Sequence, residues 1–512
     1  MQKKGAQRER ILHLLEEDGV TEESVKKVSL ETGVSEAEIW GTGLFYNLIN
    51  RPGRRIRVCD GLSCRLKGAE DLASRLASEG KEVETVSCLG QCDRAPATLD
   101  EDLEQVCYGG TDRGISEPNP DLPINLGGEP LRSFKSLEMA REIGAEEVIG
   151  SIAAAGLQGR GGAGFPAHIK WNGVRGQVET ERYVVCNADE AEPGTFKDRE
   201  IIKRQPFLLL EGLAIAAFCV GTSEIYIYIR GEFTSERRIL EAAIDDARAE
   251  LSGFNFNIVS GHGAYICGEE TALLESMEGR RGMPRLKPPF PTESGFRGKP
   301  TLIHNVETAA MVPSIVRNGG EWFKSLGRNE AGTKLYCISG HVNNPGVYEL
   351  PLGVTLDELV EVAGGYDGNP IAFSPGGPSS GFLPIEKRDV PLDFGSLAKE
   401  GSMLGSAGLV VLNDTVDMAI AASWQLQFFE DESCGQCAPC RIGTRYLKRQ
   451  TDKYLNQGDP GELEFADDVG WEMEEGSICG LGMVAAKPLE SARKYFPEAF
   501  EQRTNRGTEN ER

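Results

Sequence analysis

Apolar residues recur at helical spacing near both ends of the chain. Residues 7–49 predict short helices that pack as a small bundle, and Ser35 and Glu38 have the spacing of a capping box at the start of the third helix. From Asp414 onward, the same spacing predicts a second helical bundle. The polar residues after Phe500 lack this pattern and predict a frayed tail.

Between the two bundles, short apolar runs alternate with helical stretches. Strand candidates at 183–187, 224–230 and 254–260 are separated by helices, and this alternation predicts a largely parallel sheet. The predicted domains are a helical bundle (1–50), a compact strand–helix–strand unit (51–108), a linker rich in Gly, Pro, Asp and Asn (109–130), an α/β domain (131–329), a small mixed domain (330–412), a helical domain (413–500) and a polar tail (501–512).

Length and charge narrow the class of protein. The 512 residues are enough for roughly three or four domains of about 100 to 200 residues. The 55 basic and 79 acidic side chains give a net charge of −24, which repels nucleic acid and anionic lipid headgroups. No apolar run is long enough to span a bilayer, and residues 1–19 lack the apolar core of a secretory signal. We therefore expect a cytoplasmic protein without direct membrane insertion.

Thirteen cysteines in such a chain favour metal ligation over disulfides, because the cytoplasm keeps thiols reduced. Eight of them form two spaced sets. The other five stand alone, mostly within apolar stretches, and we interpret them as small core residues: Cys107, Cys186, Cys219, Cys267 and Cys337.

The C-terminal set consists of Cys434, Cys437 and Cys440 at intervals of three residues, together with the remote Cys479 in a glycine-rich segment. Three closely spaced thiolates and one from elsewhere fit the corners of a 4Fe-4S cluster. A zinc site would favour two separated pairs of cysteines. The spacing therefore predicts a 4Fe-4S cluster, and with it a role in electron transfer.

The N-terminal set consists of two pairs, Cys59 with Cys64 and Cys88 with Cys92, each placed where a predicted strand ends. Four thiolates suffice for a 2Fe-2S cluster. Two cysteine pairs also form structural zinc sites, so on spacing alone zinc stays an alternative.

A glycine-rich loop at 159–166 has the pattern G-x-G-x-x-G, in which missing side chains let backbone N–H groups approach a phosphate. The segment before it reads as a helix, so the strand of an ordinary dinucleotide-binding motif is absent. A plain glycine turn is the alternative interpretation. Arg160 and Lys170 flank the loop as cations and favour a flavin phosphate.

The strand at 183–187 runs into a cluster of polar groups made by Asn187, Asp189, Glu190 and Glu192. An α/β sheet places its ligand crevice at such strand ends, and these groups suit a ligand rich in hydroxyls. A solvated acidic turn is an equally good interpretation of the composition.

The loop at 261–271 leads directly into a helix, beginning near Gly268, Glu269 and Glu270. The first N–H groups of that helix can receive a phosphate or a flavin carbonyl oxygen. Capping of the helix by its own acidic residues is the alternative.

Several of these segments together resemble a known family. The segments GRGGAGFP, NADEAEPGTF, GAYICGEETALL, LKPPFP and ESCGQCAPCRIGT resemble the NADH-binding flavoprotein subunit of respiratory complex I over residues 130–500. The segments GVSEAEIWGTGLFYNLI, CDGLSC and CLGQCDRAP resemble the small thioredoxin-like 2Fe-2S subunit of the same enzyme, here fused to the flavoprotein.

The resemblance implies an α/β multidomain fold: a helical bundle plus a thioredoxin-like domain, a Rossmann-like FMN domain, a β-grasp domain, and a C-terminal helical bundle with the 4Fe-4S cluster. It favours a 2Fe-2S cluster over zinc for the N-terminal set. It implies that FMN is surrounded by Gly159, Arg160, Gly161, Gly162, Lys170, Asn187, Asp189, Glu190, Gly268, Glu269, His304 and Asn305. It also implies that the NAD(H) pocket is lined by Phe165, Glu192, Tyr265, Glu270, Lys287 and Phe290. Two positions differ from the family, since Gly173 replaces a frequent aromatic residue and His304 replaces the usual amide.

In a protein of this kind, FMN exchanges a hydride with NAD(H) and passes single electrons to the 4Fe-4S cluster, so we expect no side chain to act as acid, base or nucleophile. Glu270 and its acidic surroundings disfavour a 2′-phosphate and predict NAD rather than NADP.

The fusion looks most like the diaphorase subunit of soluble NAD-dependent formate dehydrogenases. The corresponding chain of NAD-reducing hydrogenases comes second and a fused complex I chain third. The expected partners are a catalytic subunit with molybdenum or tungsten, or with less support a NiFe hydrogenase, and other iron-sulfur subunits. A zinc-stabilised scaffold and a flavin-free ferredoxin-like carrier are the alternatives from other classes.

Overall fold

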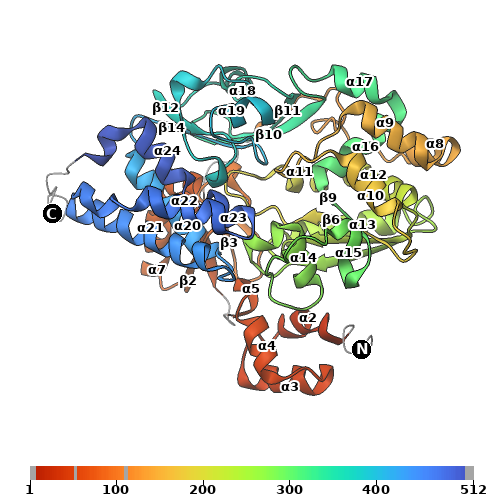
Figure 1. Cartoon of the computed structure of the whole chain (residues 1–512), viewed down its shortest axis with the longest axis horizontal. Helices are drawn as coiled ribbons and strands as arrows, with labels where there is room; N and C mark the ends of the chain where they lie inside the picture. Colours follow the sequence, from red (N-terminus) through yellow and green to blue (C-terminus); the bar gives the residue numbers. More distant parts are fainter. Residues whose placement is uncertain (1–6, 51–54, 109–113, 502–512) are drawn as a thin grey trace.

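The structure, a computed structural model, describes residues 7–50, 55–108 and 114–501. Figure 1 shows the C-terminal helices packed on one side of the central domain, a second sheet domain above both, and the N-terminal helices below. The break expected at 51–54, the first residues of the predicted linker and the tail from 502 lie outside the described residues.

The N-terminal bundle forms as predicted. Ser35 accepts a hydrogen bond from the Glu38 N–H and so caps the third helix of the bundle. The Leu48 N–H donates to the His262 carbonyl oxygen at 3.0 Å, which ties the bundle to the central domain. The helices are α2 (Ile11–Leu15), α3 (Glu22–Thr32), α4 (Glu36–Gly43) and α5 (Asn47–Asn50).

A four-stranded sheet follows, in the order β2-β1-β3-β4. Strands β1 and β2 are parallel, as the strand–helix–strand pattern predicts, and the two later strands are antiparallel. Its elements are β1 (Ile56–Cys59), α6 (Leu62–Leu66), α7 (Ala69–Ser78), β2 (Val83–Val86), β3 (Ala97–Leu99) and β4 (Gln105–Cys107).

The central domain holds a fully parallel sheet in the order β8-β7-β6-β9. Helix α12 is buried along almost its whole length, because its sequence is apolar except for Glu211. The strands are β6 (Tyr183–Ala188), β7 (Glu224–Ile229), β8 (Asn255–Ser260) and β9 (Thr301–Asn305). The helices are α8 (Lys135–Ile143), α9 (Ala145–Ala155), α10 (Ala167–Arg175), α11 (Lys197–Arg204), α12 (Pro206–Val220), α13 (Thr234–Asp246), α14 (Glu270–Met277), α15 (Pro291–Ser294), α16 (Val306–Asn318) and α17 (Gly320–Ser325).

The mixed domain contains a six-stranded sheet in the order β13-β12-β14-β10-β11-β5. Strand β5 (Gly114–Ile115) comes from the segment that the sequence predicts as a linker, and Ile124 and Leu126 of that segment are buried in the core of the central domain. The segment therefore packs against both domains that it connects. The other elements are β10 (Thr333–Gly340), β11 (Gly346–Pro351), α18 (Leu356–Val362), β12 (Pro370–Ser374), β13 (Leu383–Pro384), α19 (Phe394–Lys399) and β14 (Gly408–Asn413).

The C-terminal bundle also follows the prediction. It consists of α20 (Met418–Glu432), α21 (Ala438–Gln457), α22 (Ala466–Gly476), α23 (Gly480–Val484) and α24 (Lys487–Tyr495). Of the five isolated cysteines, Cys186, Cys219, Cys267 and Cys337 are buried, as expected of core residues. The side chain of Cys107 lies outside the described part of the chain.

Candidate functional site

Two adjoining cavities lie at the carboxyl edge of the central sheet. The larger has a volume of about 700 Å³ and the smaller one about 360 Å³. Their walls share Gly161, Asn187, Asn305 and Cys479. Because β6 and β9 are parallel neighbours with Asn187 beside Asn305, the two amides reach the same edge of the sheet.

The residues predicted to bind FMN or NAD(H) line these cavities, with the exception of Arg160. The larger cavity is lined by Gly159, Gly161, Gly162, Phe165, Lys170, Asn187, Gly268, Glu269, Glu270, Lys287, Phe290, His304 and Asn305. Asp189, Glu190, Glu192 and Tyr265 line the smaller one. Segments far apart in the sequence therefore converge on one continuous space.

The glycine loop between α9 and α10 makes a cradle that side chains would fill. Gly162 and Gly164 have positive φ angles of 143° and 62°, which favour glycine. A Cβ atom on Gly161 would stand 3.0 Å from the Cβ of Asn305. The structure thus supports the close backbone approach expected for a nucleotide, although a helix and not a strand precedes the loop.

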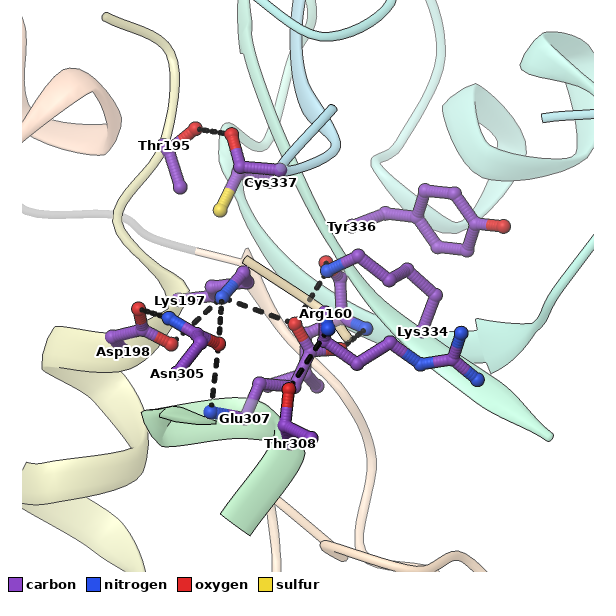
Figure 2. Close-up of polar contacts among 12 residues, drawn as sticks. Arg160, Thr195, Lys197, Asp198, Asn305, Glu307, Thr308, Lys334, Tyr336 and Cys337 are labelled. Atoms are coloured by element: carbon purple, nitrogen blue, oxygen red, sulfur yellow. Dashed lines mark hydrogen bonds and ion pairs between the residues drawn. The ribbon is translucent and has the colours of Figure 1, made fainter. Parts of the chain in front are cut away.

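Arg160 turns its side chain away from the cavities, contrary to the expectation that it faces the flavin. The fully buried guanidinium donates from Nη2 to the Ala331 carbonyl oxygen at 2.7 Å. Figure 2 shows the side chain reaching away from Lys197 and Asp198. Burial lowers its pKa, and Glu307 is the nearest charge that opposes this effect. Its backbone N–H is held by the Thr308 hydroxyl at 2.8 Å.

Paired charges line the mouth of the larger cavity. Lys170 contacts Glu270 at 2.9 Å, and Lys287 contacts Glu269 at 2.8 Å and Glu270 at 3.1 Å. Burial acts to raise the pKa of Glu270, but the two lysines hold that pKa below its usual value. A stable carboxylate at the mouth suits hydrogen bonding to sugar hydroxyls.

Two helices point their N-termini toward the larger cavity, but their charges differ. At α14, the Glu269 carboxylate accepts hydrogen bonds from the Thr271 and Ala272 N–H groups, both at 2.9 Å. The capping alternative therefore holds for this helix, which already carries its own anion. At α16, the cap is the neutral amide of Asn305, which accepts from the Glu307 N–H at 3.0 Å.

Behind the cavities lies a buried network of charges that the sequence does not reveal (Figure 2). Lys197 contacts Asp198 at 2.7 Å, Asn305 at 3.1 Å and Glu307 at 3.1 Å. Glu307 also pairs with Lys334 of β10. Burial lowers the pKa of Lys334 to about 8, although Glu307 opposes the shift. The network uses all three Lys197 donors and holds the Asn305 amide in one orientation.

The mixed domain also contributes to the site, although its sequence predicts no chemistry. Gly376, Ser379, Met403 and Ser406 line the smaller cavity. The Ser379 N–H donates to Glu192 Oε1 at 3.1 Å, while the Tyr265 hydroxyl donates to Glu192 Oε2. Two domains therefore position this carboxylate.

The C-terminal cysteines converge beside the cavities. Burial, and next the neighbouring thiols of Cys437, Cys479 and Cys434, raise the pKa of Cys440 to about 12. Cys479 lies at the start of α23 and in the walls of both cavities. Backbone N–H groups of residues 481 and 482 donate to the Cys479 sulfur. Such N–H groups stabilise thiolate charge, as the ligands of a 4Fe-4S cluster require.

The N-terminal cysteines Cys59, Cys64, Cys88 and Cys92 are all buried. Three of their sulfurs accept backbone N–H groups: Cys88 from Gly90 at 3.3 Å, Cys64 from Ala97 at 3.4 Å and Cys92 from Gly194 at 3.3 Å. These contacts fit a 2Fe-2S cluster. In the described ranges, no three His, Cys, Asp or Glu side chains converge closely enough to hold a single metal ion.

Comparison with known proteins follows this division into domains. Residues 152–314 match the Nuo51 FMN-binding domain, and residues 420–503 match the NADH-ubiquinone oxidoreductase-F iron-sulfur binding region. Residues 335–383 match the SLBB domain, and residues 2–107 match the thioredoxin-like [2Fe-2S] ferredoxin. The matches to the FMN-binding domain, the SLBB domain and the thioredoxin-like ferredoxin confirm the predicted fold class.

Two relatives, both F subunits of NADH-quinone oxidoreductase, cover the part of the chain that follows the N-terminal module. The one from Rhizobium meliloti (strain 1021), numbered 2, is 45% identical over 397 residues, which are 74% of this chain and 94% of that protein. The one from Rickettsia typhi is 45% identical over 406 residues, which are 74% of this chain and 96% of that protein. The chain belongs to the family of NADH-quinone oxidoreductase F subunits.

As a member of this family, the chain is an oxidoreductase subunit that binds FMN, NAD(H), a 4Fe-4S cluster and a 2Fe-2S cluster. A solved structure resembles nearly the whole of it, N-terminal module included. That structure is a NAD+-reducing [NiFe]-hydrogenase in the H2-reduced state, 30% identical with a TM-score of 0.89 over 97% of this chain and 93% of that chain. In the described residues, no helix is both long and apolar enough to cross a membrane.

Proposed function

We propose that this chain is the NAD(H) diaphorase subunit of an NAD-dependent formate dehydrogenase complex in the cytoplasm. The observation that carries the diaphorase role is the position of Cys479. This residue lines the same cavities as the glycine loop and belongs to the cysteine set predicted to hold the 4Fe-4S cluster. An electron that leaves a flavin in this cavity meets a cluster ligand in the cavity wall.

The side chains bind and orient the two nucleotides. The glycine loop offers backbone N–H groups to FMN, and Asn187 and Asn305 offer amides at the sheet edge. Phe165 and Phe290, about half exposed at the mouth, offer apolar faces to the adenine of NAD(H). Bound FMN supplies the exchange between a two-electron hydride and single electrons.

Glu192 is the substrate-orienting group in this proposal. Its carboxylate faces the smaller cavity, where Tyr265 and Ser379 hold both of its oxygens. Burial raises its pKa, and the two hydrogen-bond donors oppose that shift. A carboxylate held in this way accepts hydrogen bonds from hydroxyl groups of NAD(H) in one fixed orientation.

The formate dehydrogenase assignment rests on the fusion of a 2Fe-2S module to the flavoprotein. Formate chemistry would then reside on a partner subunit that carries molybdenum or tungsten, joined through other iron-sulfur subunits. A hydrogenase complex is the second candidate, favoured by the structural match that extends through the N-terminal module. A fused complex I chain is the third, favoured by the relatives at 45% identity.

Anaerobic purification of the chain tests the diaphorase role. We expect FMN, iron and sulfide in the isolated protein, and reduction of an artificial dye by NADH. A chain that contains zinc and no flavin, or one that fails to reduce the dye with NADH, contradicts the proposal. The parent complex is tested by co-purifying the partner subunits and measuring their metals, because molybdenum or tungsten supports formate dehydrogenase and nickel supports hydrogenase.

A further inference from the structure

A buried pair of side chains joins α10 to β9 at the wall of the larger cavity. The indole Nε1–H of Trp171 donates to His304 Nε2 at 2.5 Å. Trp171 is fully buried and His304 is 5% exposed. An indole nitrogen can only donate, so His304 Nε2 must be the acceptor, and the proton of the neutral imidazole must sit on Nδ1.

The ring therefore offers one hydrogen-bond donor of known position. His304 Nδ1 has no hydrogen-bond partner among the described residues, while the ring lines the cavity next to Lys170 and Thr308. Burial, and next the charge of Lys170, lower the pKa of His304 to about 3, although Glu270 opposes this. The ring consequently stays neutral at physiological pH and cannot turn without losing Trp171.

The N-terminus of α16 lies at the same wall. This helix of 13 residues begins directly after His304 and Asn305, and its residue Thr308 lines the cavity. Its cap is a neutral amide, whereas α14 carries the Glu269 carboxylate at its start. An anionic group is attracted to the first helix end and repelled by the second, because the dipole of α14 is already satisfied by a negative charge.

We propose that Trp171 is a positioning residue that fixes His304 as an Nδ1–H donor to the phosphate of a flavin nucleotide at the N-terminus of α16. This inference rests on the proposed flavin-binding function and deepens it. It replaces Arg160, whose guanidinium faces away, with a neutral donor on the phosphate. It also assigns a role to Trp171.

The test compares FMN with riboflavin, which lacks the phosphate. Flavin-depleted full-length chain is titrated with each ligand, and the dissociation constant is measured from flavin fluorescence. Binding of FMN by the wild-type chain is established first, together with dye reduction by NADH. Failure at that step rejects the proposed function itself. Every later result concerns only His304 and Trp171.

Two conservative variants separate the cavity donor from the contact with Trp171. His304→Gln can still accept from Trp171 but has no donor at the Nδ1 position, and we expect FMN to bind roughly 10- to 100-fold more weakly, as for a lost hydrogen bond to a charged group. His304→Asn keeps an amide donor near the Nδ1 position and loses the contact with Trp171. We expect its FMN affinity to stay within about 3-fold of wild type and its thermal stability to fall.

Riboflavin affinity should change by less than about 3-fold in both variants, because the lost contact is to the phosphate. Trp171→Phe should weaken FMN binding by roughly 3- to 10-fold, because only a fraction of the rings then carries the proton on Nδ1. Equal losses for FMN and riboflavin in His304→Gln overturn the proposal. A stronger loss of FMN affinity in His304→Asn than in His304→Gln also overturns it, since a purely structural pair gives that order.

Discussion

Replacing Tyr265 with phenylalanine tests how Glu192 is positioned. Tyr265→Phe removes one of the two protein donors to the Glu192 carboxylate and leaves the Ser379 N–H at 3.1 Å. A hydrogen bond to a charged group contributes about 1.5–3 kcal/mol, and each 1.36 kcal/mol is a factor of ten. If Glu192 orients NAD(H), we expect the KM for NADH to rise by roughly 10- to 150-fold while FMN stays bound.

The assay is steady-state reduction of an artificial dye by NADH, with FMN content measured on the same samples. Tyr183→Phe is the matched control, because the Tyr183 hydroxyl donates to Glu181 at 2.7 Å outside the cavity walls formed by the described residues. The reasoning is refuted if Tyr265→Phe changes KM by less than about 3-fold, or if the control raises KM to the same extent.

Three further substitutions test stability and the cluster. Burial raises the pKa of Glu211 to about 6, above its value in the unfolded chain, so stability falls as pH rises from about 4.5 to 6. Glu211→Gln should therefore raise the free energy of unfolding in urea by about 2 kcal/mol at pH 8 and leave it unchanged at pH 4, and equal shifts at both pH values would contradict this. Lys334→Met leaves buried Glu307 with one cation fewer and should lower the free energy of unfolding by about 3 kcal/mol, whereas an unchanged urea midpoint would show that the pair contributes nothing. Cys479→Ser should abolish the electron paramagnetic resonance signal of the reduced 4Fe-4S cluster while the 2Fe-2S signal and FMN persist, and loss of both cluster signals would reject separate ligand sets.

The sequence by itself determined the parts of this protein that depend on local spacing. Cysteines at intervals of three, glycines in a tight loop and apolar positions at helical or strand spacing each act over a few residues. Their consequences are therefore visible without the fold. The parallel sheet, the two helical bundles and the cysteine sets all appear in the structure where these patterns predict them.

Sequence could not determine where long side chains point. Arg160 belongs to the glycine motif, yet its guanidinium turns toward Ala331, because the carbonyl oxygen and Glu307 compensate the buried cation there. The predicted linker supplies a strand and buried residues for a similar reason. A short irregular segment acquires its partners only after the domains on each side have formed.

The tertiary structure alone decided which distant groups meet. Lys334 reaches Glu307 from another domain, and Trp171 reaches His304 across 133 residues of sequence. Charged and polar groups like these have no local pattern, because their cost of burial is offset only by a partner that folding brings to them. The same desolvated surroundings that hide these groups from sequence reasoning make each contact strong enough to set the orientation of Asn305 and His304 at the cavity wall.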